Sequence, residues 1–226
     1  MNNREFEPAG MVRWYDPLQL LHTARQVFLS TLFTDFFDRR LIQAIPSRPG
    51  TWYDYSIDET KQFRDELWFD YVADTGDGWN STYAVAYWLS QPSLGVRCTG
   101  NNEKAEEQCE TKRGDFLILG GDEVYPTASR SNYKQRLILP YQTALPCRKD
   151  GPQPTVFAIP GNHDWYDNLA SFTNLFFYKD WFSGWRTQQE RSYFALKLPH
   201  GWWLCGVDVQ LGSDIDRPQL DYFGEF

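Results

Sequence analysis

The stretch TVFAIPGNHDWYD (Thr155–Asp167) joins an apolar run directly to a polar cluster. The apolar run stops at a Pro-Gly pair, which is typical of a buried strand that ends in a sharp turn. Asn162, His163 and Asp164 then bring an amide, an imidazole and a carboxylate to the end of that strand. The stretch therefore predicts a functional site on the loop after a buried strand.

Two earlier apolar runs end in a similar way, the first before DTGDG and the second before GDEVY. Helical segments fit between these runs, and two further apolar runs joined by a PHG turn follow. The expected strands are Leu67–Ala73, Phe116–Gly120, Thr155–Pro160, Ser192–Leu198 and Trp202–Val207, and the expected helices are 81–91 and 129–139, the second stopped by Pro140. This alternation of strands and helices indicates an α/β fold.

The N-terminal part, residues 1–50, reads as a separate helical segment before a domain at 51–226. Asp16-Pro17 is a good helix start, with a capping carboxylate followed by proline at the first helical position. The helix is expected to end before Pro46. Within this expected helix, apolar side chains recur at helical spacing, namely Leu18, Leu21, Ala24, Phe28, Leu32 and Phe36. We expect this stripe to face the core; the alternative is a surface that lies on a membrane or on another domain.

Composition limits the classes of function. The chain of 226 residues carries a formal net charge of -8, which argues against a generally basic surface for nucleic acid. Met1–Pro8 has no secretory signal, and no apolar stretch is long enough to span a bilayer, so a cytoplasmic location is expected and membrane association has no support. The polar stretch Cys98–Gly114, part of an insertion at about 95–114, reads as exposed. Cys98 and Cys109 flank its polar centre and are placed so that they could meet, but we expect the reduced state of an intracellular protein.

The polar residues after the first three strands fall at one edge of the predicted sheet. Ligands of α/β sheets gather at the carboxyl ends of the strands, and here these ends deliver Asp74, Asp122 and the Asn162–Asp164 cluster. Carboxylate and amide oxygens on converging loops suit divalent or trivalent metal ions. Two such ions clamp a phosphoryl group and generate hydroxide at neutral pH. The sequence therefore predicts a metal site for phosphoryl chemistry.

Three motifs carry a resemblance to a known family. In order they are Asp74-Thr75-Gly76, Gly121-Asp122 and Gly161-Asn162-His163-Asp164. This series resembles that of the calcineurin-like metallophosphoesterases. The D-x-G form of the first motif and the GD-x-x-Y form of the second, which ends at Tyr125, resemble the purple acid phosphatases within that family. The resemblance implies two packed β-sheets flanked by helices, of which this chain covers roughly the first half, with the domain incomplete at its C-terminus.

The resemblance also implies a centre of two divalent or mixed-valence metal ions (Fe, Mn or Zn). Asp74 would bind the first metal and Asp122 would bridge both. Tyr125 would complete the shell of the first metal, where a phenolate favours Fe(III), and Asn162 would bind the second through its amide oxygen. Two alternatives stay open: Tyr125 is equally a packing residue, and Asp77 is the rival of Asp74 unless it caps the following helix.

The same resemblance implies roles for the histidine and the carboxylate of the third motif. His163 would contact the phosphate and protonate the leaving group, while Asp164 would orient the His163 ring. The implied activity is hydrolysis of a small phosphate ester or a phosphorylated substrate by hydroxide held on the metals. Trp165 and Tyr166 are predicted either to wall the substrate pocket or to pack in the core, and Asp208 is predicted to be structural.

The family's remaining ligands, a lone His and a GHxH motif, have no counterpart in this chain. Its three histidines are His22, His163 and His200, and the first and last match no family ligand. The first interpretation is that the missing ligands follow Phe226 in a longer protein. The alternative is a non-catalytic binding or regulatory module with the same fold.

Overall fold

A five-stranded sheet, in the order β2-β5-β6-β8-β7, forms the centre of the computed structural model, which describes residues 7–34, 51–99, 106–147, 153–209 and 214–226. Its strands are β2 (Phe69–Val72), β5 (Phe116–Leu119), β6 (Thr155–Ala158), β7 (Trp181–Phe182) and β8 (Trp185–Thr187). The first three and β8 pair in parallel, and β7 pairs with β8 antiparallel. The three strands predicted to end in polar motifs are confirmed as neighbours.

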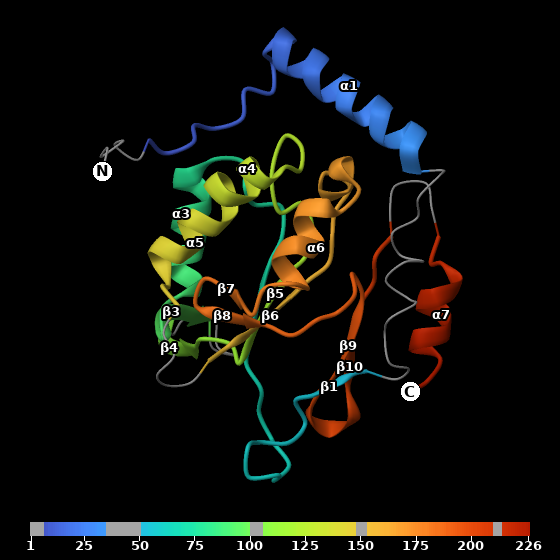
Figure 1. Ribbon diagram of the computed structural model, residues 1–226. Coiled ribbons are helices and arrows are strands. Elements are labelled where there is room, and N and C mark those ends of the chain that lie inside the picture. Colours follow the sequence, from blue (N-terminus) through green and yellow to red (C-terminus); the bar gives the residue numbers. More distant parts are fainter. Residues whose placement is uncertain (1–6, 35–50, 100–105, 148–152, 210–213) are drawn as a thin grey trace.

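A second sheet of three strands packs against the first (Figure 1). It contains β1 (Tyr53–Asp54), β9 (Phe194–Lys197) and β10 (Trp203–Gly206). The strands β9 and β10 pair antiparallel through the single turn η3 (Pro199–Gly201), as the PHG turn predicts. The mixed α/β architecture with two packed sheets is therefore confirmed.

Alternation along the central strands divides the core into two layers. Phe116 and Ile118 of β5 and Phe157 of β6 face the second sheet, where they meet Phe194 and Leu196 of β9. The intervening residues of the same strands face the helices. Because side chains of a strand point alternately to its two faces, a strand buried on both sides reads as a continuous apolar run. Burying each of these phenylalanines contributes roughly 1.5–3 kcal/mol.

Helices cover the other face of the central sheet and follow the chain around it (Figure 1). They are α3 (Trp79–Leu89), α4 (Arg130–Asn132), the π-helical segment η1 (Tyr133–Ile138), α5 (Leu139–Ala144), the 3-10 turn η2 (Asp164–Asp167) and α6 (Ala170–Phe176), while α7 (Arg217–Phe223) packs near β9. The prediction that Pro140 ends a helix is wrong. Pro140 directly follows the π-helical segment η1, whose wider turn has the backbone N of Leu139 donating to the carbonyl of Lys134, and the chain stays helical from α4 to Ala144.

Helix α1 (Pro17–Thr34) begins where the sequence predicts it to begin, with Asp16 Oδ1 accepting from the backbone N of Leu18 at 2.9 Å. We expected its apolar stripe to face the core, but the structure shows that it does not. Leu18, Leu21 and Phe28 are 78%, 70% and 64% exposed among the described residues. Figure 1 shows α1 as a separate blue helix at the top of the view. Residues 35–50, on which the predicted end of this helix falls, lie outside the described residues.

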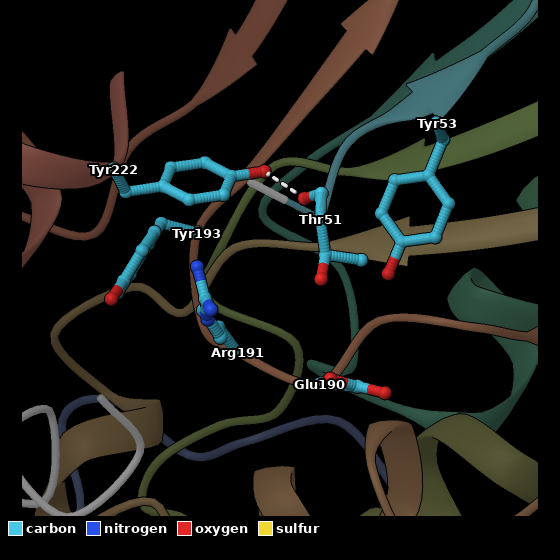
Figure 2. A pocket seen from close by; sticks show the side chains of 6 residues that line it. All are labelled: Thr51, Tyr53, Glu190, Arg191, Tyr193 and Tyr222. Carbon is cyan, nitrogen blue, oxygen red and sulfur yellow. Dashed lines mark hydrogen bonds between the residues drawn. The ribbon is translucent and has the colours of Figure 1, made fainter. Parts of the chain in front are cut away.

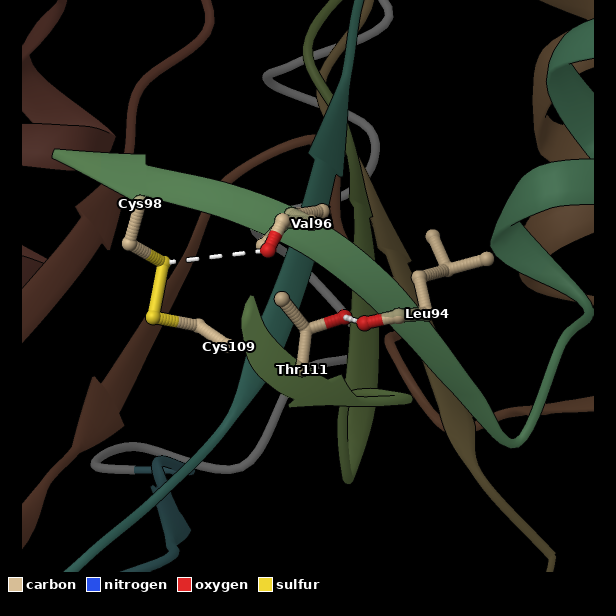
Figure 3. The surroundings of a disulfide bond; sticks show 5 residues. All are labelled: Leu94, Val96, Cys98, Cys109 and Thr111. Atoms are coloured by element: carbon tan, nitrogen blue, oxygen red, sulfur yellow. Dashed lines mark hydrogen bonds between the residues drawn. A yellow bond between two sulfur atoms is a disulfide. The ribbon is translucent and has the colours of Figure 1, made fainter. Parts of the chain in front are cut away.

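The polar stretch predicted as an exposed insertion forms a β-hairpin of its own. Its strands are β3 (Ser93–Thr99) and β4 (Glu106–Lys112), which pair antiparallel as a two-stranded sheet. A disulfide joins Cys98 to Cys109 across this hairpin (Figure 3), which corrects the expectation of reduced thiols. The two sulfurs meet because Cys109 pairs with Val96, which places it diagonally opposite Cys98. Residues 100–105 of the insertion are outside the described residues.

In the part of the chain that the structure describes, no helix combines the length and the apolar character that crossing a membrane requires.

Candidate functional site

The loops after β2, β5 and β6 converge at the carboxyl edge of the central sheet. The backbone N of Asp74 donates to the carbonyl of Gly121 at 2.9 Å, and the backbone N of His163 donates to Oδ1 of Asp122 at 3.0 Å. Asp74 and Asp122 both have left-handed backbones, with φ of 62° and 54°. Side-chain-bearing residues rarely adopt this region, and such residues cluster at ligand-binding sites. The turn geometry thus brings together loops that are far apart in sequence.

Tyr125 connects the two carboxylates. Its hydroxyl oxygen lies 3.0 Å from Oδ2 of Asp122 and also contacts Oδ1 of Asp74. Burial raises the pKa of the phenol, and its hydrogen bond to Asp74 and the charge of Asp122 raise it further. The hydroxyl therefore points into the candidate centre, which goes beyond the packing role that the sequence left open.

The loop of the third motif approaches this centre through Gly161 and Asn162. A Cβ added to Gly161 would lie 2.1 Å from Oδ1 of Asp122, so only glycine allows this approach. The amide nitrogen of Asn162 donates to the hydroxyl of Tyr166 at 3.1 Å. That bond uses the nitrogen and leaves the amide oxygen as the possible metal ligand. Oxygen-bearing side chains of Asp74, Asp122 and Tyr125 therefore meet here, and Asn162 follows Gly161 on the loop that approaches Asp122.

The resemblance implied that Asp164 orients the ring of His163. In the structure its carboxylate is instead turned into the core. Its Oδ2 accepts from the backbone N of Gly161 at 2.9 Å and of Glu123 at 3.1 Å, and its Oδ1 accepts from the hydroxyl of Tyr133 at 2.6 Å. One fully buried carboxylate thus ties the loop after β5, the loop after β6 and the η1 helix together. Burial raises the pKa of Asp164 and of the neighbouring Glu123.

The ring of His163 is oriented by a backbone carbonyl. Nδ1 lies 2.7 Å from the carbonyl oxygen of Pro126, and since a carbonyl only accepts, Nδ1 carries the hydrogen. The other ring nitrogen, Nε2, takes no part in this hydrogen bond. Three aromatic rings surround the imidazole, with centroids at 4.5 Å for Tyr125, 5.0 Å for Tyr166 and 6.2 Å for Trp14.

Several residues singled out in the sequence lie elsewhere. Trp165 is buried and its Nε1 donates to Oδ1 of Asp208 at 3.1 Å, so it packs in the core. His200 is exposed in η3, where its Nε2 lies 3.0 Å from the carbonyl of Asp65, and His22 is exposed on α1. Among the described residues, no three His, Cys, Asp or Glu side chains form a metal-binding group.

The structure also places two further residues that the sequence singled out. Asp77 does not cap α3, because the capping position is Gly78 and no side chain hydrogen-bonds there. Asp208 is fully buried and accepts from the hydroxyl of Ser192 at 2.5 Å, as expected of a structural residue. Trp14 was missed altogether, because no local pattern marks a residue that reaches the site from another part of the chain.

A small pocket lies away from this edge, between the second sheet and α7 (Figure 2). The guanidinium of Arg191 lies over the rings of Tyr222 and Tyr193, at 4.8 and 5.7 Å from their centroids. The hydroxyl of Tyr222 donates to the carbonyl of Thr51 at 2.7 Å. These contacts join α7 to the second sheet.

Polar side chains on loops at the carboxyl edge of an α/β sheet mark the edge where proteins of this class bind their ligands. The comparison with family models makes the class specific. The model of the calcineurin-like phosphoesterase family matches residues 67–205, more than half of the chain and all six predicted site residues, so the chain belongs to this family. Searches of curated proteins and of solved structures gave no match. Membership supports a phosphoesterase type of function.

Proposed function

We propose that this site hydrolyses phosphoric esters with the help of two metal ions. The contact of Asp74, Tyr125 and Asp122, with the loop of Asn162 and His163 held against Asp122, is the observation that carries the proposal. These side chains offer two carboxylates, a phenol and an amide oxygen. Such hard donors fit Fe(III) and divalent Mn, Fe or Zn.

The donor set divides naturally between two ions. Asp74 and Tyr125 would hold the first, Asn162 the second, and the carboxylate of Asp122 both. Bound ions would polarise the phosphoryl group and activate water for attack on phosphorus. Oδ1 of Asp122 is already fixed by the backbone N of His163, which orients the carboxylate before any ion binds.

His163 supplies the proton in this proposal. Its Nδ1 is held by the carbonyl of Pro126, so Nε2 is the atom that would donate to the departing oxygen of the ester. The surrounding rings limit the access of water to the imidazole. Asp164 contributes by holding the two loops in place, rather than by touching the reacting atoms.

Hydrolysis of p-nitrophenyl phosphate by the whole metal-loaded protein tests this function. Asp122→Asn and Asn162→Ala should each reduce turnover by at least roughly a hundredfold, the scale on which ligand and electrostatic groups act. Asp221→Asn is the matched control, because Asp221 is exposed on α7 in an ion pair with Arg217. Full activity in both site variants would refute the proposal.

The metal bound beside Tyr125 has a separate test. A tyrosinate bound to Fe(III) absorbs visible light, so an iron-loaded protein should be coloured and Tyr125→Phe should lose that absorption. An active, colourless protein that holds only Mn or Zn by metal analysis would refute Tyr125 as an iron ligand.

A second candidate is a non-catalytic module that binds a phosphorylated ligand. It is favoured by the absence, among the described residues, of a group of three His, Cys, Asp or Glu ligands and by the position of His200 in η3, where it contacts Asp65. A protein that binds metal and phosphate but never turns over an ester would support this function over the first.

A further inference from the structure

The N-terminal segment, residues 9–16, is fastened to the loop that carries the first motif. The backbone N of Trp79 donates to the carbonyl of Ala9 at 2.9 Å, and the backbone N of Val12 donates to the carbonyl of Asp77 at 3.0 Å. Figure 1 shows the segment running above α3 to the start of α1. Two backbone bonds at α3 and the cap of Asp16 on α1 therefore fix the chain on both sides of Trp14.

Trp14 lies against the site from this segment. Its ring centroid is 5.3 Å from that of Tyr125 at an interplanar angle of 72°, and 6.2 Å from that of His163 at 85°. These are edge-to-face contacts with one proposed metal ligand and with the proposed proton donor. Trp14 is nevertheless 40% exposed, so part of its ring is open to a ligand.

The position of Trp14 bears on the leaving group, in an inference that rests on the proposed function. The departing oxygen would lie near Nε2 of His163, so the group attached to that oxygen would lie among the rings that surround the imidazole. Trp14 and Tyr166 are the members of that set with no proposed role in metal binding or proton transfer. Aromatic rings at such distances attract a further ring beyond simple burial.

We propose that Trp14 is a specificity-determining residue that favours phosphoric esters with an aromatic leaving group. The ring of the leaving group would pack on Trp14 while the phosphoryl group occupies the oxygen-lined centre. The N-terminal segment then acts as one wall of the substrate site. Its sequence gives no sign of this role, because the role depends on where α3 holds the segment.

Binding of phenylphosphonate and ethylphosphonate to the whole metal-loaded protein, followed by calorimetry, tests the proposal. Both compounds carry a P–C bond that this hydrolysis does not cleave, so binding is measured without turnover. The wild type should bind the phenyl compound more tightly. Trp14→Ala should reduce that preference by roughly two- to tenfold, the size of one ring–ring contact. Trp14→Leu keeps apolar bulk without a ring and should show the same loss.

The matched control is Tyr15→Ala, which removes the neighbouring ring. Tyr15 is 96% exposed and makes no ring contact with the site, so the preference should be unchanged. If Trp14→Ala and Trp14→Leu leave the preference intact, or weaken both phosphonates equally, the specificity role is overturned. If the wild type binds neither phosphonate, the proposed function itself fails, and that outcome is distinct from the other two.

Discussion

Gly161 is the residue at which the loops after β5 and β6 come closest. An added Cβ would lie 2.1 Å from Oδ1 and 2.4 Å from the backbone N of Asp122, so the Asp122 loop would have to move. We expect Gly161→Ala to lower the free energy of unfolding by about 1–3 kcal/mol and to weaken metal binding. Urea denaturation and metal titration measure the two effects. Gly95→Ala, with no atom within 4 Å of its Cβ, should change stability by less than about 0.5 kcal/mol, and equal losses would contradict this argument.

Asp164 is expected to act on stability more than on chemistry. Asp164→Ala would leave the backbone N of Gly161, the backbone N of Glu123 and the hydroxyl of Tyr133 without their acceptor, at a cost of at least about 2 kcal/mol. Tyr133→Phe removes one of these bonds and should cost about 1 kcal/mol. Chemical denaturation measures both variants. Unchanged stability in Asp164→Ala, with turnover alone reduced, would restore the role of orienting His163.

Tyr55 gives the fold a dependence on alkaline pH. Burial between the two sheets raises the pKa of its phenol to about 12, above the value near 10 of the unfolded chain. A raised pKa favours the neutral form in the folded state, so this stabilisation is complete below pH 10 and is lost as pH rises towards 12. Tyr55→Phe should lose stability less steeply over that range. Urea unfolding at pH 9, 10 and 11 gives the free energy of unfolding of wild type and Tyr55→Phe. An identical dependence of that free energy on pH in both proteins would contradict this role of Tyr55.

The sequence predicted the position of those candidate site residues whose signal is local. Asp74, Asp122 and Asn162 follow apolar strands and are flanked by glycine, and parallel strands deliver such residues to one edge. The partners of Asp164 could not be read in this way, because Tyr133 lies 31 residues away and reaches it only through packing of η1. Trp14 is further still from the motifs that it contacts.

At the level of elements, the pattern of apolar residues predicted where the strands lie better than it predicted what packs against each element. The apolar runs predicted β5 and β6 correctly because both faces of these strands are buried, one against helices and the other against the second sheet. The stripe of α1 has an equally clear period, yet periodicity says nothing about what covers a stripe. The polar strands β3 and β4 were missed because they pair only with each other, at the surface, and need no apolar face.

The β3–β4 hairpin should depend on its disulfide locally. A two-stranded sheet is marginally stable alone, and the Cys98–Cys109 bond closes it. We expect reduction to speed hydrogen exchange in β3 and β4 while β5 and β6 stay protected. Exchange followed by mass spectrometry measures this, with Cys147→Ser as the control for thiol chemistry. Uniform acceleration across the central sheet would contradict it. Because disulfides persist mainly in oxidising compartments, finding this bond in protein taken from cells also tests the predicted cytoplasmic location.

At the scale of the whole molecule, the fold concentrates negative charge at one edge. The chain carries a net charge of -8, and Asp74 and Asp122 are brought to the same hydroxyl of Tyr125. Nearby like charges repel, and a bound cation reverses the sign of the local field. If the proposed function holds, a bound cation would therefore relieve the repulsion between Asp74 and Asp122 and stabilise the fold.

Removal of metal is consequently expected to destabilise the whole protein. A ligand at a hundredfold excess over its Kd adds about 2.7 kcal/mol, which corresponds to roughly 5–10 °C in Tm for a chain of this size. Dialysis against a chelator should lower Tm by that amount, and Mn²⁺ or Zn²⁺ should restore it. Asp122→Asn removes one of the repelling charges, so its metal-free form should be no less stable than the wild type, yet it should gain little from added metal. Equal gains in Asp122→Asn and wild type, or none in either, would place the metal elsewhere or exclude it.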